Sequence, residues 1–85
     1  MATSAVTSAW AKVSTNCSAF AVQNLGTGPL LRVFLVATTG SAPTGEVGFI
    51  LGPAEFLSMT VSGQDLYLKV SNGAALSAEL YHDGT

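Results

Sequence analysis

The chain has 85 residues and a mass of 8.6 kDa, enough for one domain. Charged residues, three basic and five acidic, make up only 9% of it, whereas about 25% is usual in a globular domain. So few charges leave most of the surface to Ser, Thr, Ala, Gly and apolar groups, which predicts that the chain packs against other chains. The net charge of −2 and the pI of about 4.9 exclude a basic surface for nucleic acid.

The hydropathy pattern excludes further classes of protein. The longest apolar run, residues 30–37, contains Arg32 and is far shorter than the roughly 20 residues that cross a bilayer. Residues 1–5 have neither the basic nor the apolar part of a signal peptide, so we expect synthesis in the cytoplasm and no membrane partner. The mean hydropathy of +0.46, combined with few charges, is the opposite of a disordered composition.

Short runs with period-two alternation, separated by Gly and Pro, predict an all-β chain. We expect a compact antiparallel β-sandwich or jelly-roll-like barrel of about six to eight short strands. The predicted strands are residues 9–13, 19–24, 31–37, 48–51, 56–61, 66–70 and 75–81.

The first eight residues are small and uncharged, and the Ser and Thr residues among them are unfavourable in a helix interior. We therefore expect residues 1–8 to be an extended N-terminal arm and residues 9–85 to be a single β domain. Two placements of the arm remain open: an additional edge strand on its own domain, or a segment that reaches across to a neighbouring subunit.

Residues 56–81 are predicted to form a three-stranded meander. Residues 62–65 suit a four-residue hairpin connection, and Asn72-Gly73 is a strong signal for a type I′ turn. Residues 31–37 are apolar on both faces, which indicates a central strand covered on both sides. The polar segment 38–47 is predicted to be a loop, and its length favours a functional role.

No arrangement of residues predicts catalysis, a cofactor or a metal. The lone His82 lies near the end of the sequence and is expected at the surface, and Cys17 has no base or cation near it in sequence. One His, one Cys and five separated carboxylates show no spacing typical of metal ligands. We therefore expect no catalytic, cofactor-binding or metal-binding residues and no enzyme.

Five segments between residues 10 and 70 form a further pattern of strands and turns, without a catalytic signature. They are Trp10-x-Lys12-Val13, Val22-Gln23-Asn24-Leu25-Gly26, Ser41-Ala42-Pro43, Gly48-Phe49-Ile50-Leu51-x-Pro53-x-Glu55 and Asp65-Leu66-Tyr67-Leu68-Lys69. Together these segments resemble the small all-β virion structural proteins of tailed bacteriophages.

This resemblance implies a capsid decoration (cement) protein on the virion surface, which binds the major capsid protein or another virion protein and stabilises neighbouring capsid subunits. It also implies a homo-oligomer, a trimer or a dimer. The alternative within the same class is a small tail, fibre or baseplate component, in which receptor or glycan binding is possible. We expect the interface among Ala2, Val6, Trp10, Phe34, Pro43 and Val47.

Overall fold

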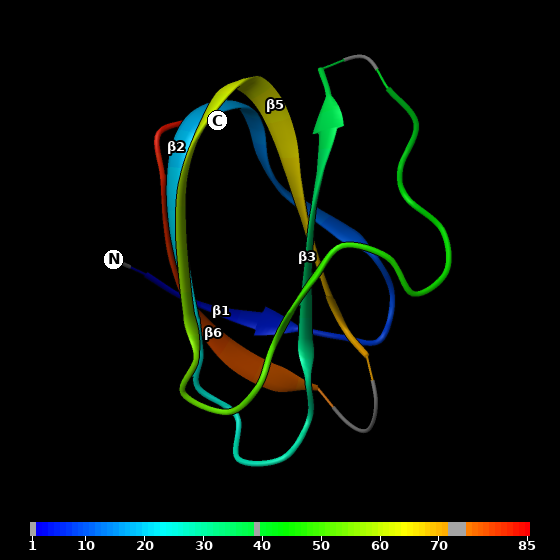
Figure 1. The fold of residues 1–85 in the computed structure, drawn as a ribbon, viewed down its shortest axis with the longest axis vertical. Helices are drawn as coiled ribbons and strands as arrows, with labels where there is room; N and C mark the ends of the chain where they lie inside the picture. Colours follow the sequence, from blue (N-terminus) through cyan, green and yellow to red (C-terminus); the bar gives the residue numbers. More distant parts are fainter. Residues whose placement is uncertain (1, 39, 72–74) are drawn as a thin grey trace.

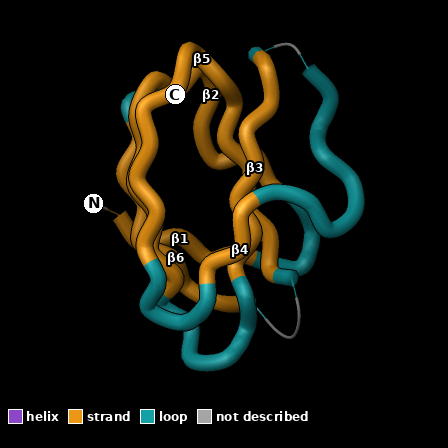
Figure 2. The backbone as a smooth tube through the Cα atoms, in the orientation of Figure 1, coloured by secondary structure: helices purple, strands orange, loops and turns teal. Residues whose placement is uncertain are grey.

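The computed structural model describes residues 2–38, 40–71 and 75–85. They form one curled antiparallel sheet of six strands in the order β1-β6-β2-β5-β3-β4 (Figures 1 and 2). The described residues contain no helix. The all-β antiparallel prediction is therefore confirmed, and the curled sheet is compatible with a small barrel or sandwich. The strands are β1 (Ala2–Val6), β2 (Ala11–Asn24), β3 (Leu31–Ala37), β4 (Phe49–Leu51), β5 (Phe56–Val70) and β6 (Leu76–His82).

Two long strands, β2 and β5, pair along their length and bend together at one corner. Asn16 in β2 and Gly63 in β5 both have positive φ, 54° and 65°, and the register of the pair shifts around Asn16. A Cβ on Gly63 would lie 2.7 Å from Oδ1 of Asn16, so glycine suits both the conformation and the space. Figure 1 shows β5 passing over the end of the molecule at this bend.

The bend divides the curled sheet into two layers. Layer A consists of β1, β6, residues 19–24 of β2 and residues 56–62 of β5. Layer B consists of residues 11–17 of β2, residues 64–70 of β5, β3 and β4.

Hydrogen bonds at the sheet margins connect the layers. The Val70 amide of layer B donates to the Thr7 carbonyl directly after β1 at 2.8 Å, and Nδ2 of Asn24 in layer A donates to the Leu51 carbonyl of β4 at 3.0 Å.

The core lies between the two layers and is built from the alternating apolar positions. Its buried residues are Val6, Cys17, Phe20, Val22, Leu31, Val33, Leu51, Leu66, Leu68, Val70, Leu76, Ala78 and Leu80. The buried Asn24 side chain is satisfied inside it: Nδ2 donates to the carbonyls of Pro29 and Leu51, and Oδ1 accepts from the Gly26 amide. Cys17 is a free, buried thiol.

The predicted meander is wrong. Residues 62–65 are not a hairpin, because the chain continues through Gly63 as the single strand β5. The two halves of β5 keep their apolar side chains inward because the bend changes the phase of the alternation between Val61 and Leu66. Strand β6 pairs with β1 and β2 instead of β5. The predicted turn at Asn72-Gly73 lies outside the described residues.

The N-terminal segment adopts the first of the two placements that were left open for it. Residues 2–6 form β1, which pairs with β6 of the same chain from Ala2 opposite Leu80 to Val6 opposite Leu76. Val6 is only 3% exposed, so burial of its side chain holds the strand on the domain. The edge-strand alternative is the one that the structure adopts.

Candidate interaction surface

The outward face of layer A is broad and almost without charge. Its side chains are those opposite the core on each strand, and Glu79 is the one charged group among them. They are Thr3 and Ala5 of β1, Ser77, Glu79 and Tyr81 of β6, Ala19, Ala21 and Gln23 of β2, and Phe56, Ser58, Thr60 and Ser62 of β5. We call this set the neutral face.

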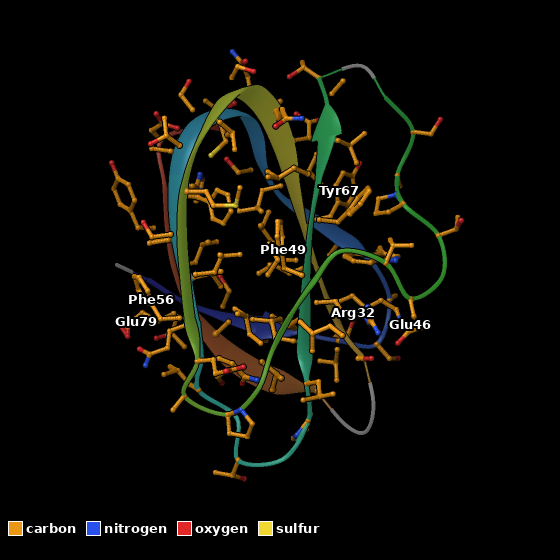
Figure 3. All side chains as sticks on the ribbon, in the orientation of Figure 1. Arg32, Glu46, Phe49, Phe56, Tyr67 and Glu79 are labelled. Carbon is orange, nitrogen blue, oxygen red and sulfur yellow. The ribbon has the colours of Figure 1, made fainter. Side chains whose placement is uncertain are left out.

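Cross-strand register arranges the neutral face in rows. One row runs from Thr3 through Glu79 and Gln23 to Phe56. The next places Ala21 between Tyr81 and Ser58. Figure 3 shows Phe56 and Glu79 on the same side of the molecule. The two large apolar groups, Phe56 and Tyr81, are 56% and 50% exposed, so the face combines aromatic side chains with small hydroxyl and methyl groups.

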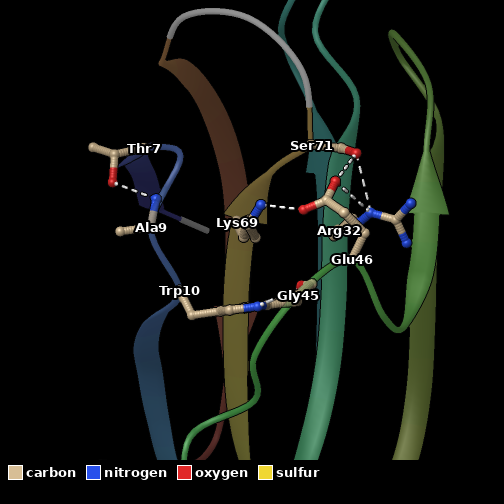
Figure 4. A network of polar contacts seen from close by, with 8 residues as sticks. All are labelled: Thr7, Ala9, Trp10, Arg32, Gly45, Glu46, Lys69 and Ser71. Carbon is tan, nitrogen blue, oxygen red and sulfur yellow. Dashed lines mark hydrogen bonds and ion pairs between the residues drawn. The ribbon is translucent and has the colours of Figure 1, made fainter.

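The outward face of layer B is covered by the chain itself over β3, whereas Ile50 of β4, beside Arg32, is 49% exposed. Trp10 packs on Phe34 with ring centroids 6.3 Å apart, and its indole Nε1 donates to the Gly45 carbonyl at 3.0 Å (Figure 4). Tyr67, the register partner of Phe34, is buried beside this cluster. The loop between β3 and β4 therefore covers the outward side of β3, which agrees with the prediction that residues 31–37 are covered on both faces.

An ionic cluster fixes the same loop to layer B. The carboxylate of Glu46 accepts hydrogen bonds from Lys69 Nζ, from Ser71 Oγ at 2.5 Å and from Arg32 Nε at 3.3 Å (Figure 4). The hydrogen bond from Lys69, followed by that from Ser71, lowers the pKa of Glu46 from 4.5 to about 2. The cluster gathers two of the chain's three cations on the covered layer, and the third, Lys12, lies near Asp65 of the same layer.

The residues predicted as an interface do not gather on one free surface. Val6 is buried in the core of its own chain. Trp10, Phe34 and Pro43 are half-buried in layer B and its loop, whereas Val47 is 37% exposed on that loop. Ala2 lies on β1, at the opposite side of the sheet order from β3 and β4. The structure thus gives Trp10 and Phe34 contacts within the chain.

Sequence reasoning overlooked the neutral face, although its signal was present. Period-two alternation already separated Phe56, Ser58 and Thr60 from Leu57, Met59 and Val61. Both sets contain apolar groups, so the alternation did not identify which side faces solvent. The pairing of β6 with β2, which brings Tyr81 beside Ala21, joins segments far apart in the sequence.

His82 is less isolated than the sequence predicted. Its Nδ1 lies 2.8 Å from Oγ of the buried Ser14, and the ring is half-buried. Asp83 does not orient this ring, because its carboxylate accepts hydrogen bonds from the Ser18 and Ala19 amides, which lower its pKa. The contact gives His82 a structural partner and holds the last described residues against the bulged part of β2.

Within residues 2–38, 40–71 and 75–85, we find no pocket and no group of three or more side chains that could hold a metal ion. The same residues form no helix long and apolar enough to cross a bilayer.

Comparison with protein-family models, curated proteins and solved structures gives no match to this chain. The resemblance to phage virion proteins is therefore not supported by any of the three.

Proposed function

We propose that this protein is a non-enzymatic structural component that packs against a larger protein assembly through the neutral face. The observation that carries the proposal is the difference between the layers. The three cations lie on layer B, whose outward side the chain covers itself over β3 and leaves Ile50 exposed on β4, whereas layer A leaves Phe56 and Tyr81 exposed among small uncharged groups.

The composition of the neutral face suits burial against another protein. Burying an ionised group without a partner is costly, and Glu79 is the one such group on the face. Aromatic side chains supply much of the binding free energy at interfaces because they bury a large area with few rotatable bonds. Phe56 and Tyr81 can serve as these anchors, and the alanines between them allow a partner to approach the sheet closely.

The more specific form of the proposal is a phage capsid decoration protein that bridges neighbouring capsid subunits. It rests on the sequence resemblance. Repeated copies on a shell would bind strongly even if each contact were weak, because many contacts act together. The alternative, a small tail, fibre or baseplate component that recognises a receptor or glycan, would use the same exposed aromatic groups for a different partner.

Purified particles from infected host cells would separate these roles. A decoration protein should be present in proportion to the major capsid protein, and particles without it should lose DNA at a lower temperature but still adsorb to cells. A receptor-binding component should be scarce, and its removal should abolish adsorption without changing heat stability. Absence of the chain from all particles would contradict both forms of the proposal.

A substitution tests the broader proposal on any assembly that contains the chain. Ala21→Lys adds a charge at the centre of the neutral face, whereas Ser41→Lys adds the same charge to the exposed loop of layer B. Both variants should fold like the unaltered chain, because both side chains point away from the core. Ala21→Lys should fail to enter the assembly, and equal incorporation of both variants would contradict a role for the neutral face.

A further inference from the structure

The first half of β5 has a backbone edge without a strand partner among the described residues. Residues 56–60 pair with β2 on one side. Strand β3 reaches β5 only from Gln64 onward, and no described backbone group bonds to the other edge of residues 56–62. The second half of β5, in contrast, lies between β2 and β3.

Burial along β5 follows this difference. Leu66, Leu68 and Val70 point inward from the paired half and are 0–1% exposed. Leu57, Met59 and Val61 also point inward, but they are only partly buried, as is Leu35 on β3. Phe49, opposite the inward-pointing Val33, is also 48% exposed. The core is thus incompletely covered beside the open edge.

The direction of the free backbone groups follows from the hydrogen bonds of β2. The Asn24 amide donates to the Glu55 carbonyl, whereas the Leu25 amide donates to Ser77 on β6. Alternation along an antiparallel ladder then directs the backbone groups of Leu57 and Met59 toward β2. Those of Ser58 and Thr60 point to the open edge, where they can pair with an added strand.

The composition of the edge favours a second copy of this chain as that strand. Residues 56–64 contain no charge and no proline, so two copies meet without like-charge repulsion. Antiparallel pairing about a two-fold axis at Met59 places Leu57 opposite Val61 of the other copy and Ser58 opposite Thr60. Apolar groups then meet apolar groups on the core side, and hydroxyl groups meet hydroxyl groups on the neutral face.

We infer that two copies of this chain join by antiparallel pairing of their β5 edges, centred on Met59. The interface is isologous, as two-fold symmetry requires, and it continues the four strands of layer A into one sheet of eight. Two neutral faces then lie side by side on this sheet. The inference specifies the geometry of a homo-oligomer and extends the proposed function, because the doubled face would bind an assembly at two places.

The mass of the purified chain in solution tests the pairing without any other partner. Sedimentation equilibrium at high micromolar concentration should give twice the chain mass of 8.6 kDa. Met59→Lys places an inward-pointing charge at the centre of the edge and should halve the measured mass. The matched control Thr3→Lys, on the outward side of β1, should remain a dimer. A monomeric unaltered chain, or a Met59→Lys dimer with an unchanged circular dichroism spectrum, would overturn the inference.

Cross-linking tests the register even if Met59→Lys fails to fold. Residue 59 faces its own copy at a position without hydrogen bonds across the open edge, where Cα atoms approach to about 4.5 Å and a disulfide fits. Met59→Cys should therefore form a covalent dimer under mild oxidation. Ser58→Cys, which faces Thr60 instead of itself, should not, and the unaltered chain with its buried Cys17 gives the background. Cross-linking of Ser58→Cys but not Met59→Cys would overturn the register.

Failure of this inference and failure of the proposed function are distinguishable. If the unaltered chain is monomeric in solution but Ala21→Lys fails to enter the assembly, the neutral-face proposal is retained and the edge pairing is rejected. If Met59→Lys abolishes the dimer but Ala21→Lys still enters the assembly, the edge pairing is retained and the neutral-face proposal fails.

Discussion

The two layers of this small sheet differ in whether the chain itself covers their outward sides. Layer B is covered over β3 by the loop between β3 and β4, which Trp10 and the cluster around Glu46 hold in place. Layer A has no such cover from the described residues, and it presents Phe56 and Tyr81 to solvent. The few cations of this chain thus all form ion pairs on layer B. The outward side of layer A has no cation and is suited to burial against a partner protein.

The largest expected effect tests the covered layer. Trp10→Ala removes the ring that packs on Phe34 and the hydrogen bond to the Gly45 carbonyl. Because the ring is half-buried, the loss should be about 2–3 kcal/mol of unfolding free energy, below the range for a fully buried Trp. Urea denaturation followed by circular dichroism measures it. If the unfolding free energy changes as little as it does for an exposed residue, the contacts of Trp10 with Phe34 and Gly45 do not hold the loop.

The bend between the layers gives the next effect. Gly63→Ala introduces a Cβ at a φ of 65° and 2.7 Å from Oδ1 of Asn16. We expect a loss of about 1–3 kcal/mol, the usual cost of a residue with a side chain in a strained backbone region. Gly28→Ala is the matched control, since a Cβ there meets nothing within 4 Å. Equal stability of the two variants would contradict the steric account of the bend.

Acid should loosen the covered layer through Glu46. Its pKa is lowered on folding from 4.5 to about 2, so its ionised form stabilises the folded state above pH 4.5. This contribution decreases as the pH falls from about 4.5 to about 2. Glu46→Gln should therefore lower the melting temperature at pH 7, and the difference from the unaltered chain should vanish near pH 2. A difference independent of pH would mean that the ion pairs do not act in this way.

The smallest expected effect on folding belongs to the neutral face. Phe56→Ala should change the unfolding free energy by no more than about 0.5 kcal/mol, because its side chain is 56% exposed and contributes little to the core. The same substitution should weaken incorporation into an assembly, because it removes an aromatic anchor. A large loss of stability would show that Phe56 acts within its own chain, as Trp10 does.

The difference between the layers also shows what could be predicted from sequence. Alternation located the strands because burial of one face leaves a period of two, and the strands at 31–37 and 48–51 are close to β3 and β4. Glycine misled the prediction at Gly63, since the same residue permits a turn or a bend within a strand.

The candidate surface was harder to predict than the fold. The neutral face depends on the pairing of β2 with β6, which is about sixty residues away in the sequence, and no local pattern encodes such a partner. The prediction instead favoured Trp10 and Phe34 as large apolar groups, and the structure places both against each other.

The central claim, that the neutral face and not the loop of layer B binds the larger assembly, is tested most directly by rebinding. Particles stripped of the protein would be mixed with folded Ala21→Lys or with folded Ser41→Lys, and the bound fraction measured by quantitative gel analysis. We predict that Ser41→Lys rebinds like the unaltered chain and that Ala21→Lys does not. Rebinding of Ala21→Lys with loss of Ser41→Lys would place the contact on the loop and contradict the account.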